Sequence, residues 1–412
     1  MVTDIKEFAK TAKPSVAVVG LGGAGCNITT WIAEKGMAGG RIIAANTDVN
    51  HLYIQKADKL ILLGEKICRG HGCGGFPEMG AQATRENYDE IKAELDGANL
   101  VFLVAGLGGG TGTGAMPVVA EITREMGALT VGCVTIPFTI EMSRREKSRT
   151  AISQLAQSCD SVVIIDNSKL REVAGNLPLK EALNVANALV GAFVKNLTDT
   201  ITQPSLVNLD YADLRAVMER GGVSSIGIGE GDGEDRVEKA VAQALSTPLL
   251  DVRDISASYG VLVHIVGGED LTLEEVAVAG ELIMDKVPNT KRIIWGAKVD
   301  NNLTGMVRVM AVLTGVESPF LSGEETQRIR EEHVKTSVET HVEEPGSIPE
   351  PAIRPKVEAP KPRVEAPKTK TVTKVSPPKT EVKNEEKSSS MYIWIVLIVL
   401  ILAGLLWYLE II

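Results

Sequence analysis

The stretch Gly106-Leu-Gly-Gly-Gly-Thr-Gly-Thr-Gly-Ala-Met-Pro117 follows directly on the apolar run LVFLVAG at residues 100–106. Consecutive glycines after a buried strand let backbone N–H groups surround phosphate oxygens, and threonine hydroxyls can add hydrogen-bond donors. A P-loop would end in lysine, which this stretch lacks. It therefore predicts a phosphate-binding loop of another kind, at the carboxyl end of a strand.

A second glycine-rich loop lies near the N-terminus. VAVVG (16–20) leads into Gly20-Leu-Gly-Gly-Ala-Gly25, the G-x-G-x-x-G spacing of dinucleotide-binding loops, and Asp48 ends the next predicted strand. A third glycine-rich segment, RGHGCGGFPEMG, covers residues 69–80. Because one such loop suffices for a pyrophosphate in a Rossmann fold, several loops around one crevice indicate a polyphosphate ligand.

Apolar runs alternate with helix-like segments through the first half of the chain. The runs are continuously apolar, as in strands that are buried on both faces of a parallel sheet. The segment 116–127 is one of the intervening helices. This alternation predicts a doubly wound α/β domain. The predicted strands are 16–20, 41–46, 59–63, 100–106, 129–136 and 161–166.

A second, smaller domain follows a long helix. Residues 179–195 carry apolar side chains at helical spacing, which predicts a helix connecting two domains. We therefore divide this part of the chain into a nucleotide-binding domain (1–178), a connecting helix (179–200) and an α+β domain (201–318). In the last of these we predict helices at 236–246 and 272–287 and strands at 260–268, 292–300 and 306–315.

The C-terminal part has a different composition. Residues 331–390 are rich in proline and poor in apolar residues, which predicts a disordered linker. Residues 391–409 are uncharged and nearly all apolar, and as a helix they would span about 28 Å, close to the thickness of a bilayer core. Lys383 and Lys387 precede this segment and no lysine or arginine follows it. We expect one transmembrane helix, with the bulk of the chain on the cytoplasmic face of the membrane.

Charge and cysteine content narrow the function further. The formal net charge of −10 argues against a nucleic-acid partner, which usually requires a basic face. Five irregularly spaced cysteines in a chain without a secretory signal indicate reduced thiols. Cys68, His71 and Cys73 have no second ligand pair, so we favour ordinary loop residues over a metal site.

The segment NLDYAD (208–213) supplies two carboxylates before a helical stretch. Asp213 fits an N-cap, whereas a cap does not explain Asp210. Two carboxylates near a γ-phosphate could order a metal ion or an attacking water.

GLGGAGCN (20–27), NTD (46–48), GGGTGTG (108–114), PFTIEMSRR (137–145) and NLDYAD, in this order, resemble the FtsZ family of the tubulin superfamily over about residues 14–318. The resemblance implies a GTPase that binds GTP or GDP, with Mg²⁺, and polymerises head to tail. It also implies that the carboxylates act on the nucleotide of the neighbouring subunit.

The resemblance assigns site residues one by one. Asn208, Asp210 and Asp213 match the catalytic loop of the family. Glu141 and Arg145 match sugar- and phosphate-side contacts, and Asn167 and Asn187 match contacts to ribose and guanine. The remaining residues that match nucleotide contacts are Gly22, Gly23, Asn27, Gly109, Gly110, Thr111, Gly112 and Thr113.

The chain departs from the family pattern in three places. Leu183 stands where the family usually has a base-stacking Phe, and Ala188 where it usually has an Asp that holds guanine. The predicted transmembrane helix replaces the usual short peptide for membrane-tethering partners. Two alternatives stay open: a scaffold or regulator with little hydrolysis that assembles with another FtsZ or with division proteins, and, from Gly20–Gly25 and Asp48 alone, an NAD-dependent enzyme.

Overall fold

A computed structural model describes residues 13–203, 205–207, 209–219, 222–246, 255–256, 258–288, 290 and 292–321. Asn208, the predicted linker (331–390) and the predicted transmembrane helix (391–409) lie outside these residues. Among the helices that the structure describes, none combines the length and apolar character needed to cross a membrane.

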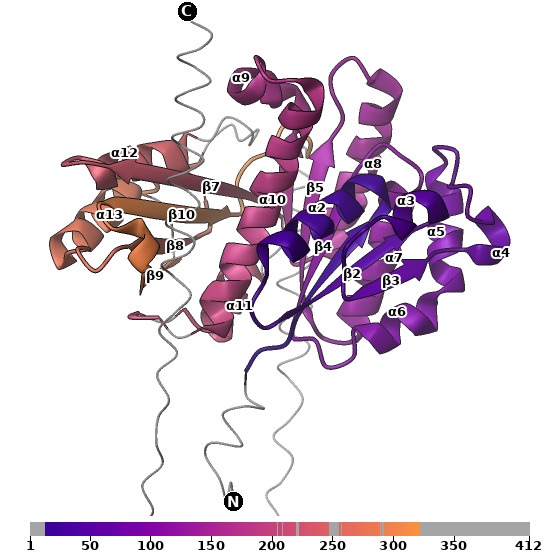
Figure 1. The fold of residues 1–412 in the computed structure, drawn as a ribbon, viewed down its shortest axis with the longest axis horizontal. Helices are drawn as coiled ribbons and strands as arrows, with labels where there is room; N and C mark the ends of the chain where they lie inside the picture. The colour runs from indigo at the N-terminus through magenta and orange to yellow at the C-terminus, as the bar shows by residue number, and fades with distance from the viewer. Residues whose placement is uncertain are drawn as a thin grey trace, which may run out of the picture. The chain divides into compact units, whose positions relative to one another are not determined.

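The described strands form one ten-stranded sheet in the order β3-β2-β1-β4-β5-β6-β7-β10-β8-β9 (Figure 1). Neighbouring strands from β3 to β7 are parallel, β10 is antiparallel to both β7 and β8, and β9 is parallel to β8. The predicted α/β fold with a largely parallel sheet is confirmed. The strands are β1 Val16–Leu21, β2 Gly40–Asn46, β3 Lys59–Leu62, β4 Leu100–Gly106, β5 Leu129–Ile136, β6 Ser161–Asp166, β7 Val223–Asp232, β8 Gly260–Gly267, β9 Arg292–Val299 and β10 Met306–Thr314.

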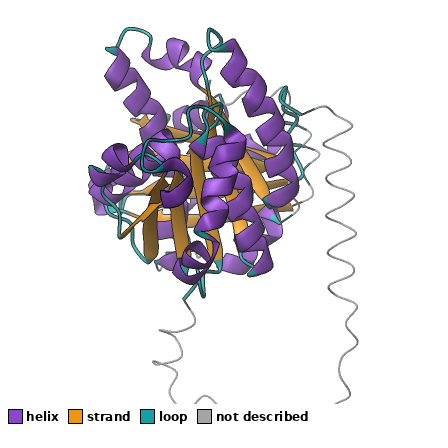
Figure 2. Cartoon of the chain, turned by 90° about the vertical axis from the view of Figure 1, so that its right-hand side faces the viewer, coloured by secondary structure: helices purple, strands orange, loops and turns teal. Residues whose placement is uncertain are grey.

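Helices surround the strands, as Figure 2 shows. The longest, α10, begins at Leu179 as predicted but continues to Thr202. The others are α2 Gly22–Lys35, α3 Val49–Tyr53, α4 Glu65–Cys68, α5 Pro77–Glu86, α6 Tyr88–Glu94, α7 Thr111–Glu125, α8 Met142–Ser158, α9 Leu170–Ala174, α11 Tyr211–Met218, α12 Arg236–Leu245 and α13 Leu273–Lys286, with short 3-10 helices at Asn167–Lys169 and Asn301–Leu303.

Two hydrophobic cores form because successive strand residues point to opposite faces of the sheet. On one face, Val18 and Phe102 pack with residues of α2 and α10, and Phe102 meets Phe193 of α10 edge-on at a centroid distance of 5.9 Å. On the other face, Val19 and Leu103 pack with residues of α7 and α8. This double coverage explains why the strands are continuously apolar.

Strand β7 was not predicted, because three of its residues are glycines, which normally weaken a strand. In the structure, these glycines allow α12 to pack closely against the strand. A Cβ atom on Gly227 would lie 1.5 Å from the carbonyl oxygen of Ala244, and one on Gly229 would lie 1.9 Å from that of Ala240. The backbone of α12 therefore rests directly on the backbone of β7.

His264 on β8 is a buried titratable group between the sheet and α10. It is 4 % exposed, its Nδ1 lies 3.2 Å from the hydroxyl of Thr200 on α10, and its Nε2 has no partner. Burial, with a smaller contribution from the charge of Lys298, lowers the pKa of His264 from 6.5 to about 4. The fold therefore holds this imidazole neutral.

We predict that His264 makes folding sensitive to mild acid. Because its pKa is lower in the folded chain, its contribution is complete above pH 6.5 and is lost as the pH falls toward 4. The loss should be roughly 3 kcal/mol. Urea unfolding at a series of pH values should therefore show a smaller pH dependence for His264→Gln than for the unmodified chain. The matched control is His71→Gln, at an exposed position, which should keep the full dependence. Identical pH profiles for the unmodified chain and His264→Gln would contradict the prediction.

Candidate functional site

The two glycine-rich loops meet at the carboxyl ends of β1 and β4, which are neighbours in the sheet. Gly22, with φ of 71°, begins α2, and a Cβ atom there would lie 2.9 Å from the backbone nitrogen of Gly112. A Cβ atom on Gly25 would lie 2.2 Å from the carbonyl oxygen of Val104, so α2 sits directly on β4. Only glycine permits both approaches, which bring two helix N-termini together at this edge of the sheet.

These N-termini suit an anion. Neither α2 nor α7 has a side-chain cap or an acidic residue in its first turn. The first backbone N–H groups of a helix have no intrahelical partner, and the helix dipole adds partial positive charge at the same end. Two uncapped N-termini at one edge of the sheet can therefore hold the oxygens of a phosphate chain. The predicted residues Gly23 and Asn27 are exposed on the first turns of α2, and Gly109 is half-buried in the second loop.

The third glycine-rich loop packs against the second. Five of its residues have positive φ, and a Cβ atom on Gly80 would lie 2.4 Å from the carbonyl oxygen of Gly110. Lys147 of α8 donates a hydrogen bond to the carbonyl oxygen of Gly75 at 2.8 Å. Backbone contacts and this lysine thus hold the third loop against the second loop and α8. The five residues are Arg69, Gly70, Gly72, Gly74 and Gly75.

The two threonines of the second loop differ in their surroundings. Thr111 is half-buried, and its hydroxyl lies 2.6 Å from that of Thr47. Thr113 is 4 % exposed, and its hydroxyl accepts a hydrogen bond from the backbone N–H of Gly108 at 2.9 Å. Thr113 therefore shapes the second loop, whereas Thr111 lies beside Gly22 of the first loop, where an added Cβ would be 3.3 Å from its own. Thr47 lies in the NTD segment at 46–48, but its residue type and spacing did not predict a site residue.

The guanidinium group of Arg145 is fixed by hydrogen bonds to other residues of the same chain. Its two terminal nitrogens donate to the carboxylate of Asp166 at 3.0 and 2.9 Å, and one of them also donates to the carbonyl oxygen of Pro137. Burial alone would raise the pKa of Asp166, but hydrogen bonds from Arg145 and Ser168 outweigh it and hold the pKa below its usual range. Asp166, which the sequence did not mark, thus fixes the orientation of Arg145.

The other predicted sugar and base contacts lie on neighbouring elements. Glu141 precedes α8 and accepts hydrogen bonds from the backbone of Phe138 and from Arg144. Asn167 follows β6, and its side-chain oxygen is buried without a hydrogen-bond partner, so a ligand hydroxyl would satisfy it. Asn187 is half-buried on α10.

The two residues that depart from the family pattern, Leu183 and Ala188, are also half-buried on α10. Leu183 packs against the core on that face of the sheet. Their effect on base recognition stays a prediction.

The carboxylates of NLDYAD form the start of α11, and our assignment of the N-cap to Asp213 is wrong. Asp210 is the N-cap, and its Oδ1 accepts from the backbone N–H of Asp213 at 2.7 Å. Asp213, in turn, accepts from the backbone N–H of Asp210 at 3.3 Å. This capping box explains both side chains structurally, because it satisfies two N–H groups of the helix start.

The capping box lies at the amino edge of the strands, away from the glycine loops. The hydroxyl of Tyr211, the first residue of α11, donates to the carbonyl oxygen of Asn99 at 2.8 Å. Asn99 immediately precedes β4, whereas the second glycine loop follows β4. The seven residues of β4 separate the two ends by about 20 Å. Within one chain, the carboxylates and the glycine loops are far apart.

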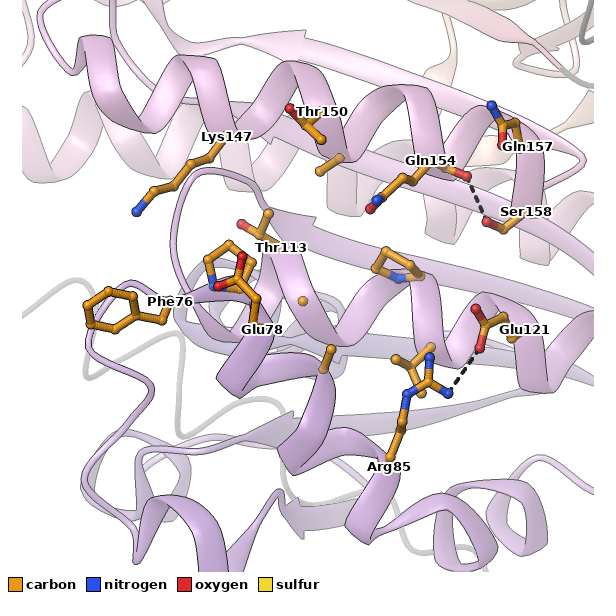
Figure 3. A pocket seen from close by; sticks show the side chains of 16 residues that line it. Phe76, Glu78, Arg85, Thr113, Glu121, Lys147, Thr150, Gln154, Gln157 and Ser158 are labelled. Atoms are coloured by element: carbon orange, nitrogen blue, oxygen red, sulfur yellow. Dashed lines mark hydrogen bonds and ion pairs between the residues drawn. The ribbon is translucent and has the colours of Figure 1, made fainter.

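A groove of about 710 Å³ lies between α5, α7 and α8 (Figure 3). Thr113 and Gly114 line this groove, so it extends to the end of the second glycine loop. Lys147 lies along one wall, and Arg85 pairs with Glu121 at 3.3 Å along the other side. Gly22, Gly109 and Gly112 are not among the residues that line this groove. Among the described residues, no group of three or more His, Cys, Asp or Glu side chains could hold a metal ion.

Comparisons with known proteins agree with this geometry. The profile described as "Tubulin/FtsZ family, GTPase domain" matches residues 15–175, and that described as "FtsZ family, C-terminal domain" matches residues 222–317. The chain is 47% identical to cell division protein FtsZ 2 of Methanocaldococcus jannaschii over 76% of its own length and 83% of that protein.

Solved structures give the same result. A point mutant of FtsZ from M. jannaschii superposes with a TM-score of 0.71 at 46% identity, covering 76% of this chain and 94% of that one. A structure described as an empty FtsZ dimer from M. jannaschii also has a TM-score of 0.71, at 44% identity, covering 78% of this chain and 94% of that one.

We predict that Gly22→Ala weakens binding of a guanine nucleotide by about tenfold relative to Gly36→Ala. Gly22 begins α2 and Gly36 follows it, and both have φ near 70°, where an L side chain is strained, but only Gly22 has the second loop within 3 Å. Gly36 has no atom within 4 Å of the added Cβ position and is therefore the matched control. Titration with a fluorescent GTP analogue measures the difference, and equal affinities would contradict the role assigned to this contact.

Proposed function

This chain is a GTPase of the FtsZ family, within the tubulin superfamily, and we propose that it hydrolyses GTP in head-to-tail filaments whose active sites are completed between subunits. The observation that carries the proposal is the separation of the glycine loops from Asp210 and Asp213 by the length of β4. Carboxylates that act on a phosphate must lie within hydrogen-bond reach, directly or through a water. A second subunit, stacked end to end, is the simplest source of the missing half.

Exposed apolar side chains at both ends support this stacking. Ile140, in the loop after β5, is 89 % exposed, and Met142, the first residue of α8, is 79 % exposed. Leu206, which leads toward α11, is 73 % exposed, and Trp295 on the edge strand β9 is 45 % exposed. Two different apolar surfaces on one chain suit a heterologous contact, which repeats into a filament when the rotation does not close.

In the proposed site, each half has its own task. The N–H groups of the glycine loops hold the phosphate oxygens of GTP, and Thr111 adds a hydroxyl. Asp210, Asp213 and Asn208 of the next subunit orient the attacking water. We propose that Mg²⁺ binds with the nucleotide, where it would neutralise phosphate charge and take most of its ligands from phosphate and water.

We predict that GTP turnover by residues 1–330 rises steeply above a threshold protein concentration, because the site is complete only in a polymer. Phosphate release measured against protein concentration, beside sedimentation, tests this. A rate per chain that is independent of concentration would contradict the proposal.

A mixing experiment separates a shared site from one within a single chain. Asp213→Asn keeps a side-chain oxygen that can accept the capping hydrogen bond, and we expect it to bind GTP but to lose about tenfold or more in turnover. Gly22→Ala carries the opposite defect, with weakened loops and intact carboxylates. In a mixture of the two variants, about one interface in four joins intact loops to intact carboxylates. We therefore expect turnover above the sum of the separate variants, whereas a simple sum would place the whole site in one chain.

We further propose that residues 391–409 anchor the filaments to the cytoplasmic face of the cell membrane, where they act in cell division or membrane shaping. The support is the uncharged apolar composition of this segment and the lysines before it. The linker of 331–390, as a flexible coil, would span roughly 40–45 Å. Its partners would then be further copies of this chain and the bilayer, with other division proteins as additional candidates.

We predict that the full chain stays with phospholipid vesicles after a wash in about 1 M salt, which screens charge attraction but leaves an inserted helix in place. The chain truncated after Ser390 should be released by the same wash. Vesicle flotation before and after washing measures this. Equal release of both proteins would rule out an anchor at 391–409.

A further inference from the structure

Cys68 and Cys73 lie side by side because the chain between them turns back on itself. Their sulfur atoms are 3.5 Å apart, and the two residues are 5 % and 3 % exposed. The left-handed conformations of Arg69, Gly70 and Gly72 curl the chain back on itself. A disulfide bond needs its sulfurs about 2 Å apart, so a local movement of about 1.5 Å would join them.

The pair touches the predicted phosphate-binding loop. The sulfur of Cys73 lies 3.4 Å from the hydroxyl oxygen of Thr47 and 3.7 Å from that of Thr111. A Cβ atom on Gly110 would lie 2.7 Å from the Cβ of Cys73, so Cys73 packs against the backbone of that loop. A change in the position of this sulfur therefore acts directly on Thr111 and Gly110.

The three other cysteines offer no comparable pair. Cys133 and Cys159 lie on opposite faces of the sheet, since they belong to different cores. Cys26 packs in a third cluster with Ala44 and Leu52. Its thiol contacts carbonyl oxygens of Gly20 and Ala45. Within the described residues, Cys68 and Cys73 thus form the one pair of contacting thiols.

We propose that Cys68 and Cys73 are a modification site, at which a peroxide converts the two thiols to a disulfide and weakens the grip of the phosphate-binding loop. One thiol loses its proton, the thiolate attacks a peroxide oxygen and the O–O bond breaks, which gives a sulfenic acid and a hydroxide that takes up the released proton to become water. The second thiol then attacks the sulfenic sulfur, the S–O bond breaks, and a second water leaves. Two thiols are oxidised and one peroxide is reduced to two waters.

The surroundings of the two thiols determine how fast they are oxidised and how the disulfide affects the loop. Burial, with the neighbouring Cys73, raises the pKa of Cys68 to about 11, so thiolate is scarce at neutral pH and oxidation accelerates as the pH rises. Hydrogen peroxide is hardly larger than water, and Cys68 and Cys73 keep exposed fractions of 5 % and 3 %. The disulfide turns the sulfur of Cys73 toward Cys68 and away from Thr47 and Thr111. This inference depends on the proposed function only where its effect on GTP turnover is concerned.

The test treats the full chain with hydrogen peroxide at about pH 8.5, blocks the remaining thiols and maps the disulfide by mass spectrometry. Trypsin cleaves after Arg69, so the bond would join two separate peptides, 67–69 and 70–85. We expect this linked pair, a several-fold loss of GTP turnover, and recovery with dithiothreitol. The matched control, Cys68→Ser, keeps Cys73 against the loop and should resist both the linkage and the loss.

Each outcome decides the inference. Absence of the linked peptides would overturn it, as would their formation with unchanged turnover, or an equal loss in Cys68→Ser. Bound GTP should slow the linkage, because it holds Thr111 and Gly110 in place, and this protection is read without any turnover. A chain that hydrolyses no GTP even before oxidation would contradict the proposed function, while the linkage and its protection would still decide the modification site.

Discussion

The direct contact of backbone with backbone is the constraint on which the rest of the structure depends. Gly25 lets α2 rest on β4, Gly22 lets the first loop meet the second, and Gly114 brings the backbone of α7 against α5. Each contact leaves no room for a single methyl group. Because the helices are seated so closely, their uncapped N-termini converge, and the site needs no lysine to attract phosphate.

Glycine also explains which parts of the fold were predictable. Continuous apolar strands and glycine loops at their carboxyl ends have local signatures, so the parallel sheet and both loops could be predicted from the sequence. Strand β7 could not, since its glycines make sense only once α12 is known to lie on them. The start of α7 was placed too late, at 116 instead of Thr111, for the same reason: glycines that usually end a helix begin this one.

The candidate site divides in a similar way. Residue types and spacing predicted the glycine-rich loops as phosphate-binding loops. The resemblance to a family predicted Asn167 as a further site residue, and its buried side-chain oxygen has no hydrogen-bond partner. Other contacts in the site have no local pattern in the sequence from which they could be predicted. The two hydrogen bonds from Arg145 to Asp166 depend on how α8 packs beside the end of β6, and the contact of Cys68 with Cys73 depends on the conformation of the loop between them. Spacing in the sequence encodes neither. The role of Asn208 stays a prediction.

The capping box at the start of α11 changes what the NLDYAD segment means in a sequence. Asp210 and Asp213 each satisfy a backbone N–H of the other, so selection for a stable helix start alone would preserve both. A descendant that had ceased to turn over nucleotide would still lose stability by discarding them. The motif is therefore a marker of this helix first, and among related sequences it would outlast the activity with which it is associated.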